Sequence, residues 1–207
     1  KLRPRTFSLI APALPHSIST ICIERDSDHY FTLDPEKPVI TNVVQRNLKR
    51  ARQALMIERS SSMQTAHDKL MREFIYRVNP PVRVQNLLSK MPGYMRHSDS
   101  CLVLNAWDVE KHLTAFYVVD LAAKDFSNYI IGCYSKRNYV LGASDLLLFE
   151  LIEMSVQYGK SYIHLGLGVN KGIRRFKEKW GARPTRRYEM CELDLRKPSM
   201  WETIKAI

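Results

Sequence analysis

Apolar positions recur along this chain with two spacings, one helical and one strand-like. Helical spacing of three and four residues runs through residues 43–53, 64–76, 82–91 and 144–158. We expect Ser144 to cap the last of these helices and Gly159 to end it. A shorter helix is expected between Asn170, its cap, and Gly181. Strand-like runs are expected at residues 54–58, 101–107, 113–120, 128–134, 161–165 and 186–193.

The order of these segments predicts an α/β (α+β) protein with a mixed sheet and helices on both faces. Short spacers join the three strands between residues 101 and 134, so an antiparallel meander is the natural arrangement. The strand at residues 128–134, the long helix and the strand at residues 161–165 form a βαβ crossover. This connection favours parallel pairing of the two flanking strands.

The first 40 residues differ from the rest of the chain. They are rich in Pro and Ser, and two strand-like pieces at residues 19–24 and 29–33 are divided by a turn expected at the polar residues 26–28. We expect an irregular or hairpin segment over residues 1–40 and a single domain over residues 41–207. Pro92-Gly93 should end the helix at residues 82–91, and a tail helix is expected at residues 201–207.

Cysteine, histidine and apolar spacing exclude several classes of protein. No Cys-x-x-Cys or paired histidine spacing occurs, so we expect free thiols in a reducing cytoplasm and no metal site. The apolar runs are too short to cross a bilayer, and the start of the chain lacks a signal-peptide pattern. Because the sequence does not begin with Met, a preceding segment is expected. The four cysteines are Cys22, Cys101, Cys133 and Cys191.

The formal charge of +11 directs attention to anionic partners, such as nucleic acid, coenzyme A or anionic lipid. Basic residues concentrate at residues 46–59 and 171–187, and Glu178 is the only acid in the second stretch. A charge run of this kind is commonly a solvated face without a ligand. Few aromatic residues accompany the second stretch, so stacking of single-stranded nucleic acid is not favoured.

Three segments resemble the GNAT acyltransferase superfamily, and within it the FemAB-like branch. They are Asn47 to Ala51, Ala143 to Glu150, and Gly166 followed by Gly172 to Pro184, in which Phe176-Lys177 precedes Trp180-Gly181. The resemblance covers about two thirds of the chain, and the last segment is its most specific part. It implies a fold in which the strand before the central helix splays from the strand after it, with an activated acyl carrier in the gap.

The resemblance also implies a carrier site at the start of the central helix. Members that bind coenzyme A wrap its pyrophosphate with an Arg/Gln-x-x-Gly-x-Gly/Ala turn, and the nearest match here runs from Arg137 to Gly142. Val140 stands where the first glycine is expected, and its side chain hinders close approach of the backbone to phosphate. This departure disfavours coenzyme A. The carrier-binding residues implied are Arg137, Gly142, Ala143, Ser144, Asn170, Arg174 and Lys177.

His164 and Tyr134 are the candidates for proton transfer. Imidazole titrates near neutrality and can act as a general base, and a phenol can protonate a leaving thiolate. Each residue also has a simpler interpretation as a packed side chain. The glycines at positions 166, 168 and 172 do not match a dinucleotide loop, because the third falls one residue late.

We therefore expect an acyltransferase that moves an acetyl or aminoacyl group from an activated carrier to an amine or hydroxyl. The carrier is acyl-coenzyme A or aminoacyl-tRNA, the acceptor is a small molecule or peptide, and no cofactor is permanently bound. Such a reaction needs positioning, an amide donor to the carbonyl and deprotonation of the acceptor. The alternative is a fold without catalysis that binds anions or nucleic acid, which predicts salt-sensitive binding and no acyl transfer.

Overall fold

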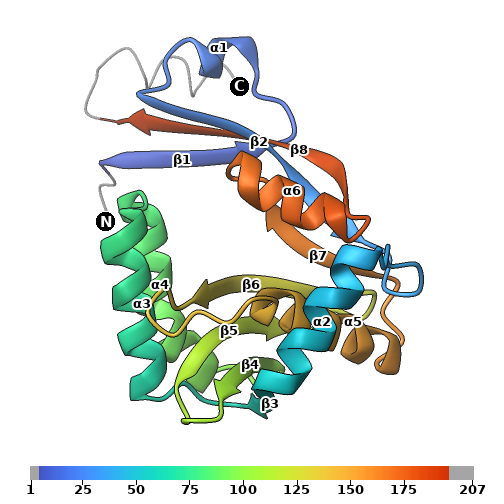
Figure 1. The fold of residues 1–207 in the computed structure, drawn as a ribbon. Coiled ribbons are helices and arrows are strands. Elements are labelled where there is room, and N and C mark those ends of the chain that lie inside the picture. The colour runs from blue at the N-terminus through green and yellow to red at the C-terminus, as the bar shows by residue number, and fades with distance from the viewer. Residues whose placement is uncertain (1–4, 196–207) are drawn as a thin grey trace.

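A computed structural model describes residues 5–195, which form an eight-stranded sheet with helices on both faces (Figure 1). The strand order is β1-β8-β2-β7-β6-β5-β4-β3. The strands are β1 (Thr6–Ala11), β2 (Glu24–Leu33), β3 (Leu55–Ser60), β4 (Cys101–Asp108), β5 (Leu113–Asp120), β6 (Phe126–Tyr134), β7 (Tyr162–Leu167) and β8 (Arg183–Asp194). The helices are α1 (His16–Ser19), α2 (Asn42–Ala54), α3 (Thr65–Val78), α4 (Val82–Arg96), α5 (Ala143–Gln157) and α6 (Lys171–Lys179). The expected tail helix at residues 201–207 lies outside the described residues.

The expected meander and crossover are both confirmed. Strands β3, β4, β5 and β6 pair antiparallel in sequence order. Helix α5 then carries the chain across, and β7 pairs parallel with β6. Only the connections from β4 to β5 and from β5 to β6 are short, whereas α3 and α4 separate β3 from β4 and α5 separates β6 from β7; strands that follow one another in the chain are still neighbours in the sheet.

The N-terminal segment belongs to the sheet, and the turn expected at residues 26–28 is wrong. Strand β2 is continuous and lies between β8 and β7. Its acidic residues suit a strand because they have partners across the fold: Asp26 pairs with Arg83 of α4, and Asp28 pairs with Arg174 of α6. The polar residues that resemble a turn in the sequence are therefore paired strand residues.

Two helix boundaries also differ from expectation. Helix α4 passes through Pro92 and ends at Arg96, because buried side chains hold it against the sheet on both sides of the proline. Helix α5 is capped by Gly142, and Ser144 lies inside its first turn. The expected cap of α6 is confirmed, since the Asn170 side chain accepts a hydrogen bond from the Ile173 N–H at 3.0 Å.

Two main hydrophobic cores lie on opposite faces of the sheet. Helices α2 and α5 and the residue that follows α6, Trp180, pack with β2 and β7 in the first core. Helices α3 and α4 pack on β4, β5 and β6 in the second core. The face of β7, β2 and β8 that points away from the first core is on the same side of the sheet as α3 and α4. Arg83 of α4 contacts this face through its ion pair with Asp26 of β2.

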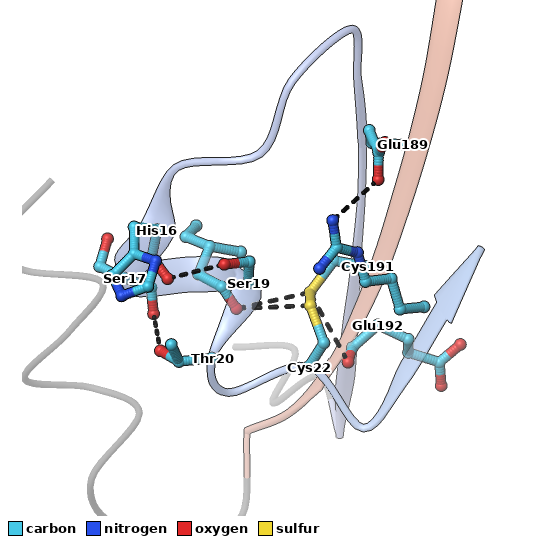
Figure 2. Close-up of a disulfide and its surroundings, with 10 residues drawn as sticks. His16, Ser17, Ser19, Thr20, Cys22, Glu189, Cys191 and Glu192 are labelled. Carbon is cyan, nitrogen blue, oxygen red and sulfur yellow. Dashed lines mark hydrogen bonds and ion pairs between the residues drawn. A yellow bond between two sulfur atoms is a disulfide. The ribbon is translucent and has the colours of Figure 1, made fainter. Parts of the chain in front are cut away.

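A disulfide joins Cys22 to Cys191, so the expectation of free thiols is wrong for these two residues (Figure 2). The bridge ties the chain between α1 and β2 to β8 and packs against Ile18 in a small third core. Cys101 and Cys133 are free and buried, as expected. Disulfides form and persist in oxidising environments. The expectation of free thiols in a reducing cytoplasm therefore agrees with Cys101 and Cys133 but not with Cys22 and Cys191.

Between residues 5 and 195, no helix is both long enough and apolar enough to cross a membrane. No group of three His, Cys, Asp or Glu side chains in the same range is arranged to hold a metal ion.

Candidate functional site

A pocket of about 270 Å³ opens at the first turn of α5. The end of β6, the loop that follows it and the start of α5 form one wall, and side chains of α2 and α6 form the other. Gly142 allows this arrangement because it has a φ of +89° and because a Cβ atom there would lie 2.5 Å from the Asn47 carbonyl oxygen. The Ser144 and Asp145 amides precede the first intrahelical bond, which runs from the Leu146 N–H to Gly142.

Asp145 is a buried carboxylate in the wall of this pocket. One of its oxygens accepts hydrogen bonds from Lys179 Nζ at 2.5 Å and from Trp180 Nε1 at 2.9 Å. The other oxygen accepts a hydrogen bond from Asn47 Nδ2 at 2.7 Å. Asp145 thus joins α2, α5 and the end of α6, and it neutralises the ammonium group nearest the pocket.

A second carboxylate, Glu73 of α3, holds the loop between β6 and α5. It accepts hydrogen bonds from the Ser135 hydroxyl at 3.0 Å, the Lys136 N–H at 2.5 Å and the Arg137 N–H at 3.4 Å. Burial raises the pKa of Glu73, but these hydrogen bonds and the Arg77 charge lower it below the ordinary value. The amides at the start of this loop therefore already face a negative charge of the chain itself.

Strands β6 and β7 part soon after they meet. They pair over three positions, the last of which joins Asn128 to His164, although both strands continue beyond that point. The register of β6 against β5 shifts immediately afterwards, because Tyr129 and Ile131 face neighbouring residues of β5 and leave Ile130 as an extra residue. Such a bulge re-aims backbone groups. The fork between β6 and β7 therefore combines an irregular backbone with the His164 side chain.

His164 is half-buried at this fork. Its Nδ1 lies 3.2 Å from Asn128 Oδ1, and an amide oxygen can only accept, so Nδ1 carries the proton and the Nε2 lone pair is free. Burial and the positive charges of Lys177 and Arg186 lower the pKa of His164 below its ordinary value. The imidazole is consequently neutral near pH 7 and able to accept a proton.

Lys177 and Arg174 of α6 point toward β2 and β7. Lys177 is 5% exposed, donates a hydrogen bond to the Leu167 carbonyl at 2.6 Å and lies over the Phe31 ring. Burial lowers its pKa to about 8, against the opposing effect of Asp28. Arg174 pairs with Asp28 at 2.8 Å, and only a glycine at position 168 leaves room for this ion pair.

The residues expected from the sequence fall into two groups. Tyr134, Gly142, Ala143 and Ser144 line the pocket. His164, Asn170, Arg174 and Lys177 lie on or near β7. Arg137 is exposed in the loop ahead of the pocket.

The structure does not bring the two proton-transfer candidates together. Tyr134 lies six residues beyond Asn128 along β6, which is roughly 20 Å at the usual rise of a strand. Tyr134 also packs under the Arg77 guanidinium, whose carbon is 4.4 Å from the ring centre. The two side chains therefore cannot act on one acyl group.

Sequence reasoning missed the side chains that organise the site from a distance. Glu73 precedes the loop it holds by more than 60 residues, and Asp28 precedes its partner Arg174 by 146. In the sequence, Asp145 is only an acidic residue of the first helical turn, where it favours the helix dipole, and its contacts with Asn47, Lys179 and Trp180 are not visible. Among them, only Asp145 carries a visible signal, since it is a charge directly before the apolar run from Leu146 to Phe149.

Comparisons with known proteins agree with this architecture. No family model and no curated protein sequence matches the chain. The C-terminal domain of a protein named as a lysylphosphatidylglycerol synthetase from Agrobacterium fabrum is similar, with a TM-score of 0.58 and 13% identity over 88% of this chain and 64% of that one. A tandem GNAT protein from the clavulanic acid biosynthesis pathway has a TM-score of 0.58 and 9% identity, covering 91% of this chain and 63% of that one. FemX has a TM-score of 0.59 and 9% identity, covering 87% and 65%.

These similarities identify the class of fold. The chain has a GNAT-like mixed sheet, in the form also seen in FemX. It spans less than two thirds of the length of each of these three structures, at 63–65%. At identities of 9–13%, the fold is what these structures share with this chain.

Proposed function

We propose that this protein is an acyltransferase in which His164 takes a proton from an amine or hydroxyl acceptor. The observation that carries the proposal is the fork between β6 and β7, where a neutral imidazole lies beside an irregular stretch of β6. The neighbours named as GNAT and FemX proteins share this fold, which makes acyl transfer the first chemistry to test.

The residues of the fork suit the proton and charge movements of acyl transfer. The acceptor attacks the acyl carbonyl, the new bond to carbon forms, and the bond to the carrier breaks. Nε2 of His164 takes the acceptor proton, while Asn128 holds the opposite edge of the ring through Nδ1. An N–H of the bulge near Ile130 is the proposed donor to the oxyanion, because the irregular register frees backbone groups there from the regular ladder.

The carrier is proposed to lie between the pocket and the fork. A carrier anchored at Ser144 needs an arm of roughly 20 Å along β6 to present its acyl group to His164. Exposed cations flank the pocket and suit a phosphate-bearing carrier. On α2 and α6 these cations are Arg46, Lys49, Arg50, Lys171 and Arg175.

Acyl-coenzyme A and aminoacyl-tRNA are the two donors to compare. Val140 replaces a glycine of the phosphate turn, and Glu73 occupies amides of the same loop. Both features disfavour a pyrophosphate at this loop, whereas the cationic flanks tolerate a larger polyanion. We therefore propose aminoacyl-tRNA as the first donor to test and acyl-coenzyme A as the second.

The test measures loss of the acyl group from each donor in the presence of a mixed pool of amines and hydroxy compounds. His164→Gln should lower the transfer rate by roughly 10²- to 10⁴-fold, as expected for loss of a general base. The donor should still raise the melting temperature of this variant, since binding does not require the base. His16→Gln, an exposed histidine of α1, is the matched control and should leave the rate unchanged.

Transfer that is unaffected by His164→Gln would refute the assigned base. Absence of transfer with either donor, together with tRNA binding that falls steeply with salt, would instead favour the non-catalytic binding function.

A further inference from the structure

A group of polar side chains surrounds His164 on the sheet face beside α4. Thr32 of β2 lies directly opposite His164 in β7 and Arg183 in β8, and Tyr30 lies opposite Arg186. Residues directly opposite each other on paired strands point to the same face. The Tyr30 and His164 rings are in contact, with centroids 5.1 Å apart. Register therefore gathers two arginines, a phenol and the imidazole from three strands.

Three of these groups lack partners within the part of the chain that the structure describes. The Tyr30 hydroxyl and the guanidinium groups of Arg183 and Arg186 make no hydrogen bond or ion pair between residues 5 and 195. Both arginines are exposed, and Tyr30 is half-buried. Arg187, their neighbour in β8, differs because it pairs with Glu189 at 2.6 Å.

The charge around His164 is consequently positive. Lys177, which packs on Phe31 from the α6 side of the sheet, and Arg186 of β8 both act on the ring, and Arg183 lies one strand further away, opposite Thr32. The two nearby carboxylates do not balance them, because Asp26 and Asp28 are already paired with arginines of α4 and α6. An acceptor whose only charge is an ammonium group is repelled from such a surface, whereas a carboxylate or phosphate is attracted.

We propose that Arg183, Arg186 and the Tyr30 hydroxyl form an anion subsite, and that the acceptor carries a carboxylate or phosphate beside its nucleophile. The subsite extends the proposed function, since it names the chemical class of compound that His164 deprotonates. Guanidinium groups bind carboxylates and phosphates through paired N–H donors. The anionic group would be held on β8 while the amine or hydroxyl faces β7.

Binding at this subsite also acts on the base. Arg186 and Lys177 are the two charges that lower the pKa of His164. An anion on Arg186 cancels one of them and so raises the affinity of Nε2 for a proton. Asn128 and Phe126 from β6 and Tyr30 from β2 also contact the ring, and all three are uncharged near neutrality. The imidazole thus becomes a stronger base when the acceptor is in place.

The test is to titrate small amines into the protein without any acyl donor and to monitor the NMR signals of the His164 ring. Three amines are compared. O-phosphoethanolamine carries a phosphate, β-alanine carries a carboxylate, and ethanolamine carries no anionic group. We expect a saturable shift and a raised pKa of His164 with at least one of the first two probes and none with ethanolamine. Arg186→Gln should weaken that binding about tenfold or more, while Arg72→Gln, an exposed arginine of α3, should leave it unchanged.

The outcomes separate the two anions and the two proposals. A response to O-phosphoethanolamine alone assigns a phosphorylated acceptor, and a response to β-alanine alone assigns a carboxylated one. The subsite is refuted if neither probe shifts His164, if ethanolamine binds equally well, or if Arg186→Gln binds unchanged. Because no donor is present, anion binding without acyl transfer would sink only the proposed reaction, and transfer to ethanolamine would sink only the subsite.

Discussion

Replacement of Asp145 by alanine tests how the pocket is held together. The carboxylate is 5% exposed and accepts hydrogen bonds from three donors on two other elements. Asp145→Ala leaves the indole N–H of fully buried Trp180 without an acceptor and the Lys179 ammonium without its counter-charge. The variant should therefore loosen α6 from the start of α5.

The magnitude follows from how much of this network is shielded from water. Breaking a buried ion pair costs about 3–5 kcal/mol when one charge is left buried. Lys179 is 26% exposed and can turn toward solvent, which places the expected cost at the lower end. We expect the free energy of unfolding to fall by about 3 kcal/mol, which lowers the melting temperature by about 6–12 °C for a chain of this length.

Urea unfolding followed by circular dichroism measures this change. Glu153→Ala removes an exposed carboxylate from the same helix and should stay within about 0.5 kcal/mol of the wild type. Asp145→Asn keeps an acceptor for Trp180 and should fall between the two. If Asp145→Ala unfolds within about 1 kcal/mol of the wild type, the network does not stabilise the pocket as argued.

Three further results are expected. Reduction of the disulfide, which spans 169 residues, should lower the free energy of unfolding by up to about 5 kcal/mol, seen in urea curves with and without dithiothreitol. Gly142→Ala should destabilise by about 1–3 kcal/mol more than Gly159→Ala, because both glycines have positive φ but only Gly142 would clash with α2. The pKa of His164 is lower in the folded protein than in the unfolded chain, so the unfolded chain binds the proton first and the wild type loses stability as the pH falls below about 6.5. His164→Gln should remove this loss, which is measured by unfolding free energies from pH 5 to 8.

The parts of the fold that depend on neighbours in sequence could be predicted. The meander at residues 101–134 and the crossover through α5 follow from spacing, because each strand pairs with the next. The place of β2 could not be found in this way, since the residues of β7 and β8 that pair with it lie 130 or more positions away in the sequence. The disulfide between Cys22 and Cys191 could not be predicted for the same reason, because no spacing rule connects two cysteines 169 residues apart.

The site divides in a similar way. The resemblance to the FemAB-like branch directed attention to the first turn of α5, where the pocket opens, because the residues of that turn are contiguous in the sequence. The neighbours of His164 come from register, and a shift of one residue in β8 would have turned Arg183 and Arg186 to the other face. No pattern in a single sequence carries that register. Trp180 of the basic stretch is buried in the core, whereas the aromatic residue that meets His164 is Tyr30, which comes from β2.

The two carboxylates at the pocket bear most directly on the choice of donor. A helix start and a loop rich in free amides would attract a pyrophosphate, but here Glu73 accepts from the loop amides and Asp145 neutralises Lys179. A pyrophosphate at this position would have to displace or face both negative charges. Exposed cations of α2 and α6 that have no acidic partner within residues 5–195, such as Arg46 and Arg175, can meet a backbone of many phosphates spread over a surface. These charges are the physical basis for proposing a large, polyanionic carrier ahead of one that inserts a single pyrophosphate.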